Sequence, residues 1–125
     1  MAKTTVDGLA AAIAAELEKY SQDVTDGLKK EVKQVAKECK QEIQQKSPVL
    51  TGSYKKGWRD RVAFENAEDI RAEVYNKTDG PLTHLLENGH AKVTGGRVDG
   101  KPHIAPAEQN AEKKLVQRAK VVVRG

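Results

Sequence analysis

The sequence has a single cysteine, Cys39, and only five aromatic residues among 125. One cysteine cannot form a disulfide within the chain, so a disulfide-stabilised fold is excluded. Because aromatic side chains are so few, the core must be built mainly from Ala, Val, Leu and Ile. Cys39 falls on an apolar stripe, which indicates a small core or interface side chain rather than a reactive or metal-bound thiol.

Long apolar runs are also missing. The apolar run at residues 8–15 lies between Asp7 and Glu16, which makes it too short to cross a bilayer and weak as a signal peptide. We therefore expect no membrane association and synthesis in a reducing cytoplasm. The length suits one domain over residues 1–125 and leaves no room for a separate cofactor-binding domain.

The net charge of +4 is unevenly distributed along the chain. Residues 1–46 hold eight basic and eight acidic side chains, whereas residues 92–124 hold eight basic and three acidic ones. A basic end of this kind favours an acidic partner surface or nucleic acid.

Apolar residues recur at steps of three or four over the first third of the chain, which predicts a helix of about 35 residues. A break near residues 21–27 would divide it, but the stripe keeps its phase, so one long or gently kinked helix ending at Ser47-Pro48 is the better interpretation. The remaining 79 residues are too few to cover such a stripe, so part of it is expected to pack on another copy of the chain. The residues assigned to this subunit interface are Leu9, Ile13, Leu17, Val24, Leu28, Val32, Val35 and Ile43.

The rest of the sequence predicts a small antiparallel sheet and two helices. Alternating apolar residues at 58–64 and 70–74, separated by a polar turn, indicate a β-hairpin. A short helix with three leucines follows and ends at Gly89, and residues 90–101 are either a mobile loop or a second hairpin. Pro106 opens the last helix, and Val121–Val123 extends as a strand or docks on a neighbour. The fold class is α+β, with a helical region at 1–46, a β-rich region at 47–104 and a helix with its tail at 105–125.

Two patterns resemble catalytic or cofactor sites, but each lacks residues or spacing that such a site needs. Residues 95–101 have the G-x-x-x-x-G-K spacing of a phosphate-binding loop, but Pro102 stands where that loop needs a hydroxyl and a helical N–H. His84, Glu87 and His90, with His103 outside, lack the spacing of a zinc-binding helix. We therefore predict no catalytic residue, no cofactor and no metal, with a metal-dependent hydrolase as the weakest alternative.

Glu87 is placed near the C-terminus of the short helix, where the helix dipole disfavours an acid. One interpretation is an exposed carboxylate. The other is that Glu87 accepts backbone N–H groups or pairs with an arginine such as Arg59, Arg61 or Arg71, which would hold the helix against the sheet.

A nucleic-acid-binding function is the main alternative to an assembly function. Lys92, Arg97 and Lys101 are basic, and so is the helix face of Lys113, Lys114, Arg118 and Lys120. Aromatic side chains that could stack on bases are missing from this stretch, so sequence-specific binding is not expected, and passing contact with phosphates stays open.

Four segments in order resemble the tail-component family of long-tailed bacteriophages and prophages. They are 47–54 (SPVLTGSY), 74–76 (VYN), 84–90 (HLLENGH) and 101–107 (KPHIAPA). Leu50 and Tyr54 depart from the Asp and Leu that are usual in the family. The motif residues are Pro48, Thr51, Gly52, Tyr75, Asn76, Glu87, Gly89, Pro102 and Pro106.

The resemblance implies a non-enzymatic virion protein at the neck, assembled in the bacterial cytoplasm. Such a head–tail joining or tail-completion protein forms a homo-oligomeric ring, a hexamer or dodecamer, between head-closure or connector proteins and tail-tube or terminator proteins. In this interpretation the apolar stripe and the hairpin edges form subunit contacts. Lys92, Arg97 and Lys101 then face a neighbouring ring or the packaged DNA.

Overall fold

The structure is a computed structural model that describes residues 9–17, 20–48 and 52–124. Within these residues a three-stranded antiparallel sheet has the order β1-β3-β2, and a separate two-stranded hairpin is formed by β4 and β5. The strands are β1 (Leu9–Glu16), β2 (Trp58–Glu65), β3 (Asp69–Asn76), β4 (Gly89–Ala91) and β5 (Arg97–Asp99). The helices are α1 (Gln22–Lys46), α2 (Ser53–Lys56), α3 (Thr83–Asn88) and α4 (Ala105–Arg124), with a 3-10 turn η1 (Gly80–Leu82) before α3. The predicted α+β class is confirmed.

The first strand corrects the predicted length of the N-terminal helix. Residues 9–16 pair with β3, with Ile13 opposite Ala72 and Ala15 opposite Ile70. The segment LAAAIAAE is apolar at every second position as well as at every fourth, so its pattern fits a strand as well as a helix. Pairing decides the outcome, because β3 is the central strand and needs backbone partners on both edges.

Helix α1 starts within the segment where a break was considered. Ser21 has extended backbone angles, and its hydroxyl accepts the N–H of Val24 at 3.4 Å, so Ser21 caps the helix. The helix ends at Lys46, and Ser47-Pro48 follows as predicted.

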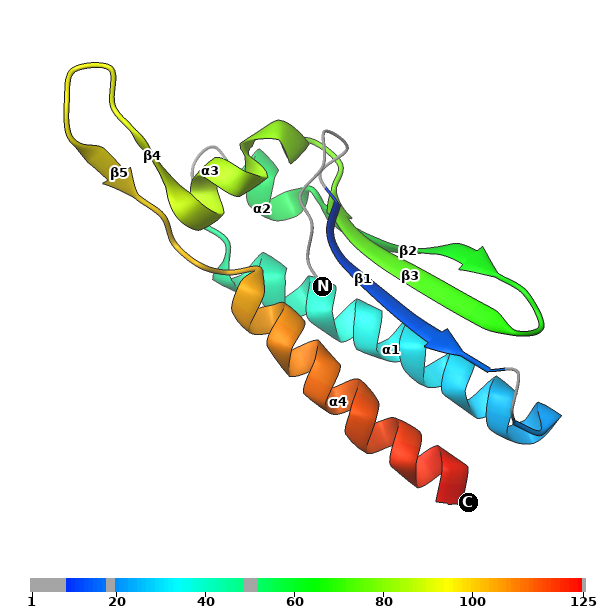
Figure 1. Cartoon of the computed structure of the whole chain (residues 1–125). Coiled ribbons are helices and arrows are strands. Elements are labelled where there is room, and N and C mark those ends of the chain that lie inside the picture. The colour runs from blue at the N-terminus through cyan, green and yellow to red at the C-terminus, as the bar shows by residue number, and fades with distance from the viewer. Residues whose placement is uncertain (1–8, 18–19, 49–51, 125) are drawn as a thin grey trace.

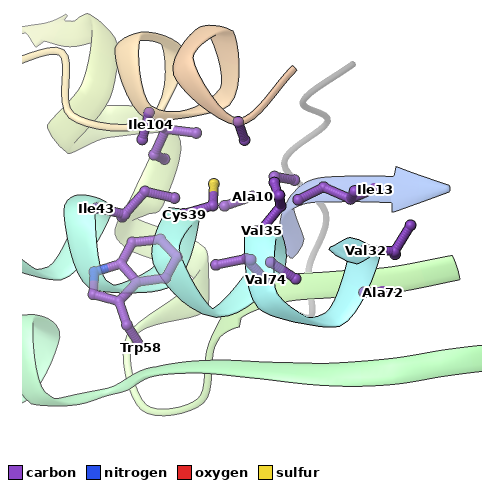
Figure 2. Packing of buried hydrophobic residues seen from close by; sticks show 14 of the residues in the cluster. Ala10, Ile13, Val32, Val35, Cys39, Ile43, Trp58, Ala72, Val74 and Ile104 are labelled. Atoms are coloured by element: carbon purple, nitrogen blue, oxygen red, sulfur yellow. The ribbon is translucent and has the colours of Figure 1, made fainter. Parts of the chain in front are cut away.

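The core lies between α1 and the sheet, with α4 closing its side (Figure 2). Apolar side chains of α1 such as Val32 and Val35 face Ala72 and Val74 of β3, and Ile104, just before α4, lies near Ile43 and Cys39. Cys39 is buried among them, and burial raises the pKa of its thiol to about 12. Cys39 is therefore a core side chain.

Burial of the apolar stripe removes the reason for assigning it to a subunit interface. Its side chains Ile13, Leu17, Leu28, Val32, Val35 and Ile43 are all buried within the chain itself. Leu9 and Val24 are partly exposed. The sheet and α4 together cover the stripe, because strand β1 shortens the helix and places its own apolar residues in the same core.

Helices α1 and α4 lie side by side and run antiparallel (Figure 1). Asn110 near the start of α4 donates to Glu42 near the end of α1 at 2.9 Å. At the other end, a side chain at Gly27 would collide with Val122 of α4, so glycine permits this close approach. The strand predicted as one alternative for Val121–Val123 is wrong, since α4 continues as a helix to Arg124.

The two hairpins agree with the sequence patterns. Strands β2 and β3 form the predicted hairpin, with a register shift between Val62 and Phe64. Residues 89–99 form the second hairpin rather than a loop, and Figure 1 shows it projecting from the body of the molecule.

The register of β1 makes a prediction that a helix at residues 9–16 would not make. Ala11 is buried opposite Val74, whereas Ala14 is exposed. We expect Ala11→Asp to lower the free energy of unfolding by several kcal/mol, because it buries an unpaired carboxylate. Ala14→Asp should change it by less than about 0.5 kcal/mol. Urea unfolding followed by circular dichroism measures both, and equal tolerance of the two variants would contradict the strand.

Candidate functional site

The family-like motif residues gather at one end of the molecule, around the base of the β4–β5 hairpin. Gly52 precedes α2 with φ +89°, Asn76 ends β3, and Glu87 and Gly89 close α3. Pro106 is in the first turn of α4, as predicted. Thr51 lies outside the described residues. The site is therefore a junction of four chain segments that carries an exposed hairpin.

Asn76 joins the end of β3 to α2. Its side-chain amide donates to the carbonyl of Tyr54 at 2.7 Å, and its amide oxygen accepts the N–H groups of Thr78 and Asp79 at 3.1 and 2.8 Å. The side chain is buried, so these bonds satisfy it away from water. A side chain at Gly57 would collide with Asn76 and Thr78, which explains the glycine between α2 and β2.

Glu87 accepts hydrogen bonds from the first turn of a different helix. Its carboxylate receives the backbone N–H groups of His103, Ile104 and Ala105 at 2.7, 2.9 and 3.0 Å. These are groups that the start of α4 cannot bond internally, so Glu87 caps α4 from α3. Its negative charge also lies at the favourable end of the α4 dipole. The backbone-acceptor interpretation is thus confirmed, but the arginine partners and the contact with the sheet are wrong: Arg61 and Arg71 pair with Glu73.

The electrostatics of Glu87 follow from this geometry. Burial by itself would raise the pKa of the carboxyl group, because it disfavours the charged form. The bonds donated by the His103 side chain and by the three N–H groups outweigh burial and lower the pKa to about 2. Glu87 therefore stabilises the folded chain as a carboxylate.

A buried polar and aromatic cluster lies next to Glu87. His103 is fully buried, with Nδ1 at 2.6 Å from the carbonyl of Lys101 and Nε2 at 2.6 Å from the hydroxyl of Tyr54. A carbonyl only accepts, so Nδ1 carries a proton. The rings of Tyr54, Trp58 and His103 meet edge to face, and Trp58 donates to Ser47 at 2.8 Å. The cluster locks α2, the end of α1 and the start of α4 together, and burial raises the pKa of Tyr54.

The hairpin leaves this junction through two glycines. Gly89 has φ +79°, and a side chain there would collide with Val98 and Gly100 of the opposite strand. A side chain at Gly100 would in turn collide with the backbone of residues 87–89. The two backbones approach so closely at the base of the hairpin that both positions need glycine. This close packing fixes the base of the hairpin, although its strands have only three residues each.

The residues predicted to face a partner or DNA lie on this hairpin and at its base. Lys92 is exposed in the turn, and Lys101 is exposed just after β5. Arg97 donates to the carbonyl of Asn88 at 2.6 Å, so part of its role is to brace the hairpin base. The tip of the hairpin also exposes Val93 completely.

The basic face of α4 differs from the prediction. Lys114 and Arg118 bind Glu38 of α1 at 3.2 and 2.9 Å. The bond from Arg118 is the main reason that the pKa of Glu38 falls to about 2. Two of the four cations on the α4 face that was proposed to contact nucleic acid are thus paired within the molecule.

A groove of about 530 Å³ runs along the free edge of β1. Ala12–Ala14 form one wall, and Glu108, Ala111, Glu112 and Leu115 of α4 contribute the other. Strand β1 carries mostly alanine side chains, whereas the strand at the opposite edge of the sheet, β2, carries charged side chains. Unprotected strand edges can pair with another chain.

The described residues contain no group of three metal-ligating side chains. Of the four residues weighed for metal binding, His103 and Glu87 are adjacent, with Nδ1 and Oε1 3.1 Å apart, and both take part in the capping network. Helices of the described chain are too short or too polar to span a bilayer.

Sequence reasoning identified Glu87, Asn76 and Gly89 but missed Tyr54, His103 and Gly100 as their partners. Glu87 stood out because an acid was in an unfavourable helical position. His103 and Tyr54 gave no such signal, since 48 residues separate them and only tertiary structure brings them together.

Comparison with known families places the chain among phage proteins. The model of a family described as "Bacteriophage HK97-gp10, putative tail-component" matches residues 11–89, which is more than half of the chain. The match covers the sheet, α1, α2 and α3, whereas most of the projecting hairpin and α4 follow it. Neither the curated proteins nor the solved structures contain a significant match.

The Glu87 cap predicts a pH-dependent loss of stability. Because the pKa of Glu87 is about 2 in the folded chain against an ordinary 4.5, its contribution is complete above about pH 5 and is lost as pH falls toward 2. We expect Glu87→Gln to lower the free energy of unfolding at pH 7 by about 2–3 kcal/mol and to flatten its decline in acid. Denaturant unfolding from pH 7 to 2.5 measures this. Glu112→Gln, on the exposed side of α4, is the control, and equal losses in both variants would refute the cap.

The hairpin base predicts a difference between two glycines. Gly89 and Gly95 both have positive φ, but a side chain at Gly95 meets only open space. Gly89→Ala should therefore cost more than the roughly 1–2 kcal/mol of backbone strain expected for Gly95→Ala, because it adds a backbone collision. Thermal unfolding and hydrogen exchange at β4–β5 would show this, and similar effects of the two substitutions would contradict the described base.

Proposed function

The chain belongs to the HK97-gp10-like family of bacteriophage tail components, and from this premise we propose that it is a neck or tail-completion subunit that assembles into a ring. The observation that carries the proposal is the family match together with a rigidly anchored projecting hairpin. As a tail component the protein is a structural part of the virion. In our proposal it is not an enzyme, and it needs no cofactor.

The ring would be a hexamer or dodecamer in which each subunit contacts the next head to tail. Heterologous contacts of this kind close into rings when the rotation between subunits allows it. The free β1 edge supports this arrangement better than the buried apolar stripe does, because its groove is open to an extended segment of the neighbouring copy.

The hairpin would contact the adjoining ring, formed by head-closure, connector, tail-tube or terminator proteins. Its exposed tip, with Val93 and Lys92, projects beyond the packed body and so reaches further than any helix of the described chain (Figure 1). In this arrangement the body forms the ring, and the hairpin docks it on its neighbour.

Assembly can be tested on the purified protein, alone and mixed with the adjoining neck proteins. We expect native mass spectrometry and negative-stain electron microscopy to show closed rings. Ala14→Arg should reduce them to smaller species without loss of stability, because Ala14 is an exposed residue of the β1 groove. Ala67→Arg, in the exposed β2–β3 turn, should leave them intact. A protein that stays monomeric under every condition would rule out the ring, and rings that tolerate Ala14→Arg would rule out the β1 contact.

A further inference from the structure

The unbalanced positive charge of the chain is concentrated at one end of the molecule. Segments 53–61 and 76–104 hold eight Lys or Arg residues and four Asp or Glu residues, so their net charge, 8 − 4 = +4, equals that of the whole chain. Figure 1 shows that α2, the start of β2, the end of β3 and the β4–β5 hairpin lie at the same end. On the basic face of α4, Lys114 and Arg118 are paired with Glu38 of α1, which leaves Lys113 and Lys120 as its exposed cations.

Four side chains from three elements form what we call the cationic cluster: Lys56, Arg59, Arg61 and Lys77. The backbone brings them together. Lys77 donates its N–H to the carbonyl of Gly57 at 2.8 Å, and Arg59 donates its guanidinium to the carbonyls of Lys56 and Trp58 at 2.7 and 2.8 Å. Arg61 lies two residues further along β2, opposite Glu73.

A polar groove of about 510 Å³ opens beside this cluster. Arg61, Tyr75, Lys77 and Thr78 line it, together with the backbone turn that leads to Pro81. The guanidinium of Arg61 is held by Glu73 at 3.0 Å and lies 4.4 Å over the ring of Tyr75, yet 53% of the side chain is exposed. Arg61 is therefore pre-oriented with donors left for an anion.

The cluster has little internal neutralisation. Across the described residues, Lys56, Arg59 and Lys77 have no carboxylate partner, and Glu73 is shared between Arg61 and Arg71. Asp79 accepts hydroxyl groups of Ser53 and Thr78 instead. Close cations without counter-charges repel one another, so a bound anion would relieve this repulsion.

The lining of the groove favours phosphate groups over a protein partner or a single strand. Protein interfaces have apolar, aromatic centres, whereas this groove is mostly polar and cationic. Single-strand binding needs open aromatic faces for stacking, but Arg61 covers the face of Tyr75. What remains is contact with the phosphate backbone of a duplex, which needs cations and no base reading.

We propose that the cationic cluster binds the phosphate backbone of double-stranded DNA without sequence preference. The contact uses the body of the subunit rather than the hairpin tip, and it does not depend on ring formation.

The test is binding of a fluorescein-labelled 30-base-pair duplex to the full chain, followed by anisotropy over a salt series starting near 50 mM. We expect Lys56→Glu with Lys77→Glu to raise Kd at least tenfold and to reduce the slope of log K against log salt by about 1–2. Both side chains are exposed and make no side-chain bond with the described residues, so folding should be unaffected. Circular dichroism and thermal unfolding would confirm this.

Two variants with the same change in net charge serve as controls. Lys113→Glu with Lys120→Glu alters the exposed side of α4, and Lys92→Glu with Lys101→Glu alters the hairpin and its base. Each should raise Kd less than about threefold. Absence of duplex binding by the unaltered protein at 50 mM salt would overturn the proposal, and so would an equal loss in either control. Neither result bears on whether the protein forms rings, which the mass measurement decides separately.

Discussion

The carboxylate of Glu87 is the interaction on which this arrangement depends. It replaces the missing hydrogen-bond acceptors at the start of α4 with an acceptor from α3, 16–18 residues earlier in the chain. Without it, N–H groups around the buried residues His103 and Ile104 would lose their partners. The same bond fixes both ends of the β4–β5 hairpin, because Gly89 follows α3 and Gly100 precedes α4. One partly buried carboxylate thus sets the position of the last helix and of the projecting β4–β5 hairpin.

Most of the fold could be predicted from the sequence, and the failures have a common cause. The β2–β3 hairpin, α3, its terminal glycine and the start of α4 follow from local periodicity and turn residues. The helix predicted at residues 9–16 was wrong because a run of alanines fits the period of a strand as well as that of a helix. Only pairing with the edge of β3 decides between the two structures. The strand predicted at Val121–Val123 was wrong because packing of Val122 over Gly27 outweighs the strand preference of valine.

The candidate site was predictable where a residue conflicted with its local position. Glu87 conflicted with the dipole of its own helix, and that conflict indicated a partner elsewhere. His103 and Tyr54 are not unusual for their local sequence positions. The hydrogen bond between them can therefore be seen only in the folded structure. The same reasoning applies to charge: the sequence places the basic end at residues 92–124, but two of its eight cations, Lys114 and Arg118, pair with Glu38 of α1. A second group of cations, at the end of α2, in β2 and just after β3, comes together only in the folded chain, which no linear count could reveal.

Burial of the apolar stripe also changes how assembly has to be argued. A subunit that leaves a large apolar face open would associate through that face, with little control over direction. Here the sheet and α4 cover the stripe within the chain, so in our proposal the contacts are directional: a strand edge with small side chains, a hairpin fixed at two glycines and a cluster of cations. Backbone pairing specifies register, and charge specifies which surface approaches a polyanion. Contacts that are directional and use different parts of one subunit, as proposed here, suit a component that must join different neighbours in a defined order.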